Sequence, residues 1–370
     1  MTFTGVFVDD EDEEYADQLT TLGQLDIEFL PVDEVTALAT AIIARSGQFA
    51  ALDYRLDESV ANLRADQTFK GSALAQHLRD KAIEVPATDL ALVLVSAEAN
   101  VRTLYRPDKT AHDLFDRVYI KEEINAQRAR IRREVLSLAT AYETLRKSAL
   151  PYDLAALTKA QDGDREVLDS QDIRLKVQEA KAPHLLVRAV FALLIDRTGP
   201  LMDLDDVCAL FGLDRSFGAV LEPHLAGGRY EGLFGDAWPR WWTNRIETLG
   251  QEVFKRRPTG LRASDRAAIL SEAFGVALKP AVSPWTRSPH ELIAVACACC
   301  RRGVEIAHTV AIFEAALPKV LARRRICWDC VQTDAHLAAS PPLIIDEIDE
   351  SLAQEVRVMA RPAAPNEAGA

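Results

Sequence analysis

The chain has no hydrophobic run long enough to cross a membrane. Its longest apolar stretch, Leu292 to Cys300, is far shorter than the about 20 residues that a spanning helix needs, and Glu291 and Arg301 flank it. The first residues are acidic and carry no apolar leader. We therefore expect a cytoplasmic protein.

The chain also lacks the common sequence motifs of enzymes. It contains no Gly-rich phosphate loop, no nucleophile elbow and no metalloprotease spacing. Cysteine is absent before position 208, and in a chain without an export signal the six cysteines are expected to be thiols or metal ligands rather than disulfides. An enzymatic function is therefore not expected.

Basic residues are scarce in the first third of the chain. Residues 1–125 contain 24 Asp+Glu and 11 Lys+Arg, a balance of 11 − 24 = −13, whereas the remaining residues contain 32 of each. The whole formal net charge of −13 therefore belongs to the first part. Nucleic-acid phosphates would repel that part, whereas nucleic-acid binding by the neutral second part remains open, although it is not favoured.

Hydrophobic runs alternate with helical patterns over the first 125 residues. Five runs have the composition of buried strands, and helical patterns lie near 12–24, 33–46, 71–83 and, less clearly, 100–115. The expected strands are residues 3–8, 26–31, 49–53, 90–95 and 117–121. This alternation predicts a doubly wound parallel sheet with its functional site at the carboxyl ends of the strands.

Four of the five expected strands end in polar residues. Asp9 and Asp10 follow the first strand, Asp53 closes the third, Ser96 closes the fourth and Lys121 closes the fifth. Two adjacent carboxylates repel each other unless a hard cation lies between them. Mg²⁺ suits such a position because it takes oxygen ligands and retains several waters.

This order of an acid pair, Asp, Ser and Lys resembles the receiver domain of bacterial response regulators, over residues 1 to about 125. The resemblance implies a flavodoxin-like five-stranded parallel sheet. It implies that Asp53 accepts a phosphoryl group from a phosphohistidine of a histidine kinase or phosphotransfer protein. It also implies that Asp9, Asp10 and Asp53 hold Mg²⁺, and that Lys121 and Ser96 contact the phosphoryl group.

Three positions depart from the receiver pattern. Asp57 and Glu122 occupy positions where the family usually has proline. Val118 stands where the family has its switch aromatic residue, and Tyr119 comes one place later, which in a strand points to the opposite face. The residues that accept the phosphoryl group are predicted to be intact. The usual coupling from Ser96 to an aromatic residue is not expected. A pseudo-receiver used only for binding remains an alternative.

A long helix is predicted over residues 122–148 as a signalling helix. Ile124, Ile131, Leu138 and Leu145 recur every seven residues, which is typical of a coiled coil. Two interpretations remain open: a parallel helix pair that forms a homodimer, and an amphipathic helix packed on its own domain.

The rest of the chain predicts an all-α output domain over 149–340, followed by a terminal helix and a disordered tail within 341–370. Its later helices are expected near 262–276, 289–302, 304–317 and 318–330. Residues 204–221 weakly resemble a helix-turn-helix, but Ser216 to His224 contains no Lys or Arg. In the first part, the polar stretch 57–68 is expected to be a surface loop.

The spacings Cys297-x-x-Cys300 and Cys327-x-x-Cys330 are compatible with a four-thiolate zinc site, with His308 and His336 as substitute ligands. The first pair, however, lies in an apolar run that predicts the buried face of a helix. Cysteine packs well on such a face without a metal, so zinc is not favoured.

The sequence therefore predicts a response-regulator-like signalling protein. Phosphorylation of Asp53 is expected to alter dimerisation or an interaction between the helical domain and an unidentified protein partner. One alternative is a DNA-binding transcriptional regulator that uses residues 204–221. Another is a pseudo-receiver scaffold or phosphate sink in a bacterial stress or phage-defence module, an analogy only.

Overall fold

The computed structural model describes residues 2–45, 47–57, 64, 67–339 and 341–361. The chain forms two compact units. The first comprises Met1–Ala160, Ile173–Ala192 and Glu231–Trp238, and the second comprises Gln161–Asp172, Leu193–Tyr230 and Pro239–Ala370. These boundaries differ from the predicted one at residue 149, because two later segments of the chain belong to the first unit.

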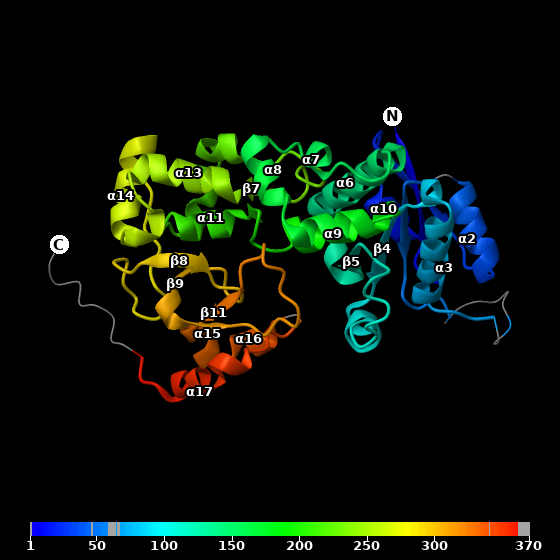
Figure 1. Ribbon diagram of the computed structural model, residues 1–370. Coiled ribbons are helices and arrows are strands. Elements are labelled where there is room, and N and C mark those ends of the chain that lie inside the picture. The colour runs from blue at the N-terminus through cyan, green and yellow to red at the C-terminus, as the bar shows by residue number, and fades with distance from the viewer. Residues whose placement is uncertain (1, 46, 58–63, 65–66, 340, 362–370) are drawn as a thin grey trace. The chain divides into compact units, whose positions relative to one another are not determined.

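A five-stranded parallel sheet forms the centre of the first unit (Figure 1). Every neighbouring pair of strands in it is parallel, in the order β2-β1-β3-β4-β5. The strands are β1 (Phe3–Val8), β2 (Leu25–Leu30), β3 (Phe49–Leu52), β4 (Ala91–Ser96) and β5 (Arg117–Ile120). The order confirms the predicted doubly wound sheet of the receiver fold.

Helices cover both faces of this sheet. Helices α2 (Val35–Ala44) and α3 (Gly71–Glu84) pack together, whereas α1 (Glu14–Leu19) packs with α6 (Arg128–Lys147). Alternate strand residues face each layer, so side chains such as Val6 and Phe7 are both buried. The helix expected near 100–115 is much shorter: α4 (Glu98–Asn100) continues into a π-helical turn at Val101–Tyr105.

The predicted helix over 122–148 is interrupted, and its heptad stripe is buried inside the chain. It forms α5 (Lys121–Ile124) and α6, and α6 contacts β3, β4 and α1. Ile131, Leu138 and Leu145 are each 2% exposed or less. The stripe is therefore not available for the coiled-coil dimer considered above. The other interpretation, an amphipathic helix packed on its own domain, agrees with the structure.

A buried polar network joins α6 and α10 (Pro183–Val190) to the amino ends of β4 and β5. Arg79 contacts Asp89 at 2.8 Å and Asp116 at 3.1 Å, and the Tyr142 hydroxyl donates to Asp116 at 2.8 Å. The backbone N–H of His184 donates to Oδ2 of Asp89 at 2.7 Å, and its Nδ1 lies 2.8 Å from the same oxygen. His184, which comes much later in the chain, thereby supplies hydrogen-bond partners to the buried carboxylate of Asp89.

The second unit is mostly helical, as predicted. Helix α11 (Leu204–Leu210) is followed by an irregular helical stretch that joins a 3₁₀ turn at Arg215–Phe217, α12 (Gly218–Leu221) and a 3₁₀ segment at Glu222–Gly228. The weak resemblance of residues 204–221 to a helix-turn-helix therefore stays a prediction.

In the second unit, β6 (Leu201–Met202), β7 (Trp241–Trp242), α13 (Thr243–Phe254) and α14 (Ala263–Phe274) pack around an apolar cluster that includes Phe211, Trp241 and Phe254. Three short helices earlier in the chain, α7 (Leu154–Leu157), α8 (Asp162–Leu168) and α9 (Gln171–Glu179), contribute no residue to this cluster.

The helices predicted over 289–302, 304–317 and 318–330 are wrong, because this region forms short antiparallel strands. The strand β8 (Ile293–Ala296) pairs with β9 (Gly303–Glu305), and β10 (Thr309–Ala311) pairs with β11 (Arg325–Cys327). The buried residues Ile293, Val304, Val310 and Ile326 supply the interior side of these strands. Strands of three or four residues are too short to show a period in the sequence.

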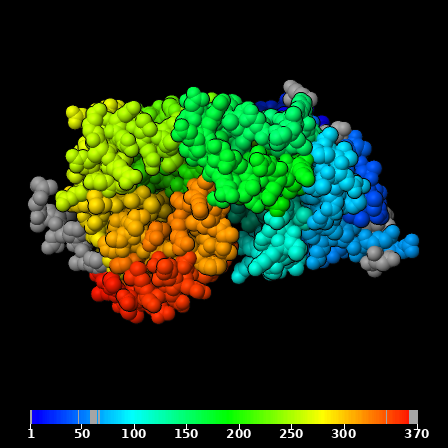
Figure 2. Space-filling model, in the orientation of Figure 1, coloured from blue at the N-terminus to red at the C-terminus, as the bar shows by residue number. Residues whose placement is uncertain are grey.

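Three short helices, α15 (Trp328–Gln332), α16 (Ala335–Ala338) and α17 (Glu350–Val358), complete this region, with α17 packed on α15. Figure 2 shows α17 in red beside the orange surface of the preceding residues. The helix α17 is the predicted terminal helix. The predicted tail from Pro362, and most of the 57–68 loop, lie outside the described residues. No helix in the described ranges combines the length and the apolar character needed to cross a membrane.

Candidate functional site

The polar residues predicted at the strand ends meet at one edge of the sheet. Asp9 follows β1, Asp53 follows β3, Ser96 ends β4 and Lys121 follows β5. Parallel strands place their carboxyl ends on the same edge, so the topology itself brings these residues together. Carboxylate oxygens of Asp9, Asp10 and Asp53 all lie within 4.8 Å of one another.

Lys121 is the cation at the centre of this group. Its Nζ lies 2.6 Å from Oδ2 of Asp9, 2.9 Å from Oδ2 of Asp12 and 3.5 Å from Oδ2 of Asp53. Burial alone would lower the pKa of Lys121, but the charge of Asp53 and hydrogen bonds to Asp9 and Asp12 outweigh burial and raise it. Asp12 was not singled out from the sequence, although the acidic run that begins at Asp9 contains it.

Asp53 occupies a buried position that disfavours its charge. It is 5% exposed, and burial raises its pKa to about 6 despite the opposing effect of Lys121. The backbone N–H of Tyr54 donates to Oδ1 of Asp53 at 2.6 Å, so this oxygen is fixed. The other oxygen, Oδ2, faces Lys121.

The loop after β1 orients Asp9 in a similar way. Its Oδ1 accepts hydrogen bonds from the backbone N–H groups of Glu11 at 2.9 Å and Asp12 at 3.1 Å. The side chain is 1% exposed, so its second oxygen is directed at the site rather than at solvent. A carboxylate held this way loses little conformational freedom when it binds a cation.

The residues present fit a divalent cation. The carboxylates of Asp9, Asp12 and Asp53 share the ammonium of Lys121, and oxygens of Asp9, Asp10 and Asp53 lie within 4.8 Å of one another. Mg²⁺ prefers hard oxygen ligands and is usually held by one or two carboxylates together with waters and phosphate oxygens. Asp9, Asp10 and Asp53 are the residues that would hold it.

Gly71, which sequence reasoning missed, lies against the backbone of Asp53. A Cβ atom at this position would lie 2.0 Å from the carbonyl oxygen of Asp53, and the Gly71 N–H donates to the carbonyl of Tyr54 at 2.9 Å. The start of α3 can approach the backbone of Asp53 this closely only without a side chain. The sequence contains no local signal for this, because the contact joins two residues that are far apart in the sequence.

Ser96 and Tyr119 occupy different surroundings. The buried Ser96 hydroxyl lies beside Asp53 and lowers the pKa of that carboxyl, although it forms no well-aligned hydrogen bond within the described part of the chain. The Tyr119 hydroxyl donates to Oε2 of Glu134 on α6 at 3.0 Å, and burial raises the pKa of Tyr119 well above its usual value. Val118 packs on the opposite face, with the core beside α2 and α3. This agrees with the expectation that the one-place shift points Tyr119 away from the usual switch position.

The four cysteines with zinc-like spacing also come together. Cys297 and Cys300 lie in the turn between β8 and β9, not on a helix, and Cys327 and Cys330 lie at the junction of β11 and α15. Their Sγ atoms all lie within 4.8 Å of one another.

The two histidines considered as substitute ligands have other contacts. Nδ1 of His308 lies near Oε1 of Glu305, and Nδ1 of His336 lies 3.2 Å from the carbonyl oxygen of Cys330.

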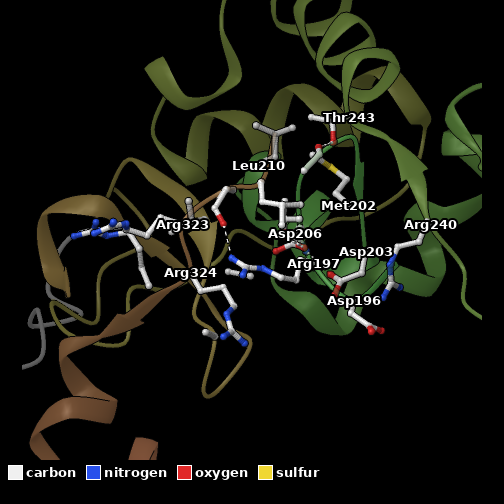
Figure 3. Close-up of a pocket in the computed structure, with 18 of the residues that line it drawn as sticks. Asp196, Arg197, Met202, Asp203, Asp206, Leu210, Arg240, Thr243, Arg323 and Arg324 are labelled. Carbon is white, nitrogen blue, oxygen red and sulfur yellow. Dashed lines mark hydrogen bonds between the residues drawn. The ribbon is translucent and has the colours of Figure 1, made fainter. Parts of the chain in front are cut away.

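The second unit also contains a cavity of about 440 Å³ (Figure 3). Its wall combines α11, through Asp203 and Asp206, with arginines from several segments, among them Arg197, Arg240 and Arg301. Arg197 already pairs with Glu314 at 2.7 Å, and Arg301 pairs with Asp203 at 2.6 Å. The lining contains seven Lys or Arg and four Asp or Glu side chains, and two of the arginines, Arg197 and Arg324, pair with Glu314 outside the lining.

No protein-family profile matches the sequence, and no curated protein matches it. Among solved structures, the chain is similar to the signal receiver domain of the response regulator NarL from Mycobacterium tuberculosis, with 22% identity and a TM-score of 0.27, covering 38% of this chain and 97% of that one.

Two further solved structures are similar. NtrX from Brucella abortus in complex with ATP has 18% identity and a TM-score of 0.26, covering 52% of this chain and 40% of that one. The response regulator RcsB from Salmonella typhimurium has 13% identity and a TM-score of 0.25, covering 52% of this chain and 89% of that one. The strand order and the residues at the carboxyl edge, rather than these scores, carry the comparison with receiver domains.

Proposed function

We propose that the first unit is a phosphoryl-accepting receiver and that Asp53 is its acceptor. The observation that carries the proposal is the meeting of Asp9, Asp10, Asp53, Ser96 and Lys121 at the carboxyl edge of the sheet. An acceptor carboxylate, further carboxylates for a cation, a hydroxyl and an ammonium are the groups that transfer of a phosphoryl group to a carboxylate requires.

In the proposed reaction, a carboxylate oxygen of Asp53 attacks the phosphorus of a phosphohistidine. The new P–O bond forms as the P–N bond breaks, and the departing imidazole nitrogen keeps the electron pair of that bond. Oδ2 is the better placed oxygen, because it faces Lys121 while Oδ1 is engaged by the backbone of Tyr54. A bound Mg²⁺ supplies neutralisation of the negative charge on the transferred phosphoryl group.

Lys121 and Ser96 act on the product in this proposal. Nζ of Lys121, 3.5 Å from Asp53, is close enough to pair with a phosphoryl oxygen after a small shift. The Ser96 hydroxyl supplies a hydrogen bond to another oxygen. The modification places nearly two negative charges at one buried point, which draws both groups toward it.

The signal leaves the site through the loop after β4. The backbone N–H of Glu98 donates to Oε2 of Glu122 at 3.1 Å, and Glu122 directly follows Lys121. Movement of Ser96 and Lys121 toward a phosphoryl group therefore strains one hydrogen bond that joins the two loops. In this proposal Glu122, at a position where receivers usually have proline, replaces the usual aromatic coupling.

The upstream partner is a histidine kinase or a phosphotransfer protein, and the downstream effect is a changed interaction with a protein partner. To test acceptance, the full chain is incubated with acetyl phosphate or phosphoramidate and Mg²⁺. Intact mass then reports the gain of one phosphoryl group. Asp53→Asn is expected to abolish the gain, whereas Asp57→Asn, which removes a nearby acid that pairs with Arg55, is expected to retain it.

Hydrogen exchange over residues 96–124 is followed in the same experiment, with beryllofluoride and Mg²⁺ as a stable mimic. Changed protection that Asp53→Asn abolishes supports a working switch. Acceptance with fast turnover and unchanged protection would indicate a phosphate sink. No acceptance and no change with beryllofluoride would overturn the proposal and leave a receiver-like binding module.

A further inference from the structure

Four thiols in the second unit have the spacing of a metal site. The Sγ atoms of Cys297 and Cys330 are 3.9 Å apart, and those of Cys300 and Cys327 are 3.8 Å apart. Zinc–sulfur bonds of about 2.3 Å in a tetrahedron place the sulfurs about 3.8 Å from one another. A disulfide would bring two sulfurs to about 2.05 Å, so the observed separations are those of ligands around a common centre.

The backbone of the first pair is folded in a tight turn. The N–H of Arg301 donates to the carbonyl of Cys297, and the N–H of Cys297 donates to the carbonyl of Arg302, both at 2.9 Å. Arg301 has φ +60°, a left-handed conformation that costs free energy for a residue with a side chain. The turn is therefore held in a conformation that brings both sulfurs to one side.

Hydrogen-bond donors point at the sulfurs. The backbone N–H of Cys327 donates to Sγ of Cys297 at 3.2 Å, and Nε of Arg302 donates to Sγ of Cys300 at 3.5 Å. The other end of the Arg302 guanidinium is fixed by Asp329 at 2.7 Å. Donors and a fixed positive charge stabilise thiolates, which are the form that binds metals, whereas thiols that only fill an apolar core do not need them.

The local core is small. The apolar cluster around the four sulfurs belongs to short strands and one- or two-turn helices between residues 293 and 358. Elements this short bury little apolar surface, and regions of this kind commonly require a metal or disulfides for stability.

We propose that Cys297, Cys300, Cys327 and Cys330 bind one structural Zn²⁺. Tetrahedral sites with four sulfurs take zinc or iron, and zinc forms closed four-cysteine sites that have no redox role. Four protein ligands leave no position for water or a substrate, so the ion acts on folding rather than on a reaction. Binding displaces the thiol protons, so affinity rises with pH.

The zinc would also fix one wall of the cavity. Arg301 leaves the Cys297–Cys300 turn and pairs with Asp203 at 2.6 Å and Asp205 at 3.2 Å. Arg215 donates to the carbonyl of Cys300 at 3.0 Å. The turn is thereby joined to α11 and to the segment that follows it, so loss of the metal is expected to release both contacts.

The first test is elemental analysis of the full chain, purified without added metal or chelator. One zinc per chain is expected. A thiol-reactive reagent should displace this zinc from the protein, and a colorimetric chelator then measures the released ion. Addition of Co²⁺ to the stripped protein should give the visible spectrum of tetrahedral thiolate coordination. A metal-free protein with four reactive thiols, a protein with two disulfides by mass spectrometry, or one that holds iron would overturn the proposal.

The second test uses matched variants. Cys297→Ser and Cys330→Ser are expected to lose zinc and to lower the melting temperature of the second unit. The controls are Cys299→Ser, whose sulfur is not among the four that converge, and Cys208→Ser on α11. Both should retain one zinc per chain. Equal zinc content in all four variants would contradict the assignment, and the metal content of the unaltered chain decides the question if a variant fails to fold.

Discussion

Nζ of Lys121 lies 2.6 Å from Oδ2 of Asp9, closer than it lies to the acceptor Asp53. The ammonium thereby neutralises a carboxylate that a divalent cation would also bind. A Lys121→Met chain is therefore expected to lose about 3 kcal/mol of stability without divalent cations, because the buried carboxylates of Asp9 and Asp53 lose the ammonium that pairs with them. Added Mg²⁺ should raise its melting temperature more than that of the unaltered chain.

Thermal denaturation with excess Mg²⁺ and with EDTA measures both quantities. Lys109→Met, a change outside the site, is the control. An equal effect of Mg²⁺ on the unaltered and Lys121→Met chains would show that the ammonium and the cation do not compete.

The stability of the first unit should depend on pH through Asp53. Burial raises the pKa of Asp53 to about 6, whereas an unfolded chain has a value near 3.9. Between about pH 4 and 6 the folded chain thus binds more protons than the unfolded one, so its free energy of unfolding falls as pH rises. Each unit of difference between the folded and unfolded pKa corresponds to about 1.4 kcal/mol, so the free energy of unfolding falls by at most about 3 kcal/mol.

Asp53→Asn removes this ionisation. In metal-free buffer the variant should be more stable than the unaltered chain above pH 6, and the difference should close as pH falls to about 4. Urea denaturation across this range measures it. A difference that stays constant between pH 4 and 7 would show that Asp53 does not carry the raised pKa.

Gly71→Ala should destabilise the first unit, although replacing glycine by alanine in a helix usually stabilises. The new Cβ would lie 2.0 Å from the carbonyl oxygen of Asp53, so the acceptor loop or the start of α3 must move. The expected loss is about 2 kcal/mol, together with slower phosphorylation. Gly260→Ala, where a Cβ meets open space, should be near neutral. Urea denaturation and the rate of mass gain check both.

His184→Ala should destabilise the first unit by about 2 kcal/mol, because it removes the imidazole from a buried oxygen of Asp89. Burial raises the pKa of Asp89, and Arg79 and His184 together lower it below its usual value. The matched control is His77→Ala, a half-buried histidine on α3, which should cost little. Similar losses in both variants, measured by urea denaturation, would argue against a specific role for the network.

The sheet and its site were predictable because both depend on local pattern and a general rule of topology. Each strand is a continuous apolar run, and the carboxyl ends of parallel strands must share an edge. Asp9, Asp53, Ser96 and Lys121 therefore come together without any knowledge of the loops. Gly71 is different, because its role depends on how a loop returns to Asp53.

Periodicity was less informative farther along the chain. The heptad stripe of α6 predicted a buried face but not the surface that covers it, which is the first unit's own sheet and α1. Around Cys297 an apolar run was interpreted as a helix, whereas Gly303 and the cysteine turn divide it into short strands. The spacing of the four cysteines was more informative there, because it indicates that their sulfurs meet at one point and does not depend on a repeating helix or strand pattern.

The bond between His184 and Asp89 has a consequence for how such a chain can evolve. Recombination at residue 125 or 148 would separate the segment that resembles a receiver from His184, so each recombinant would keep only one member of the Asp89–His184 pair from this chain. Exchange of the receiver is therefore expected to yield a folded product only when residues 173–192 are inherited with it. The gene segments that encode residues 1–160 and 173–192 should behave as linked traits, although the codons of residues 161–172 lie between them.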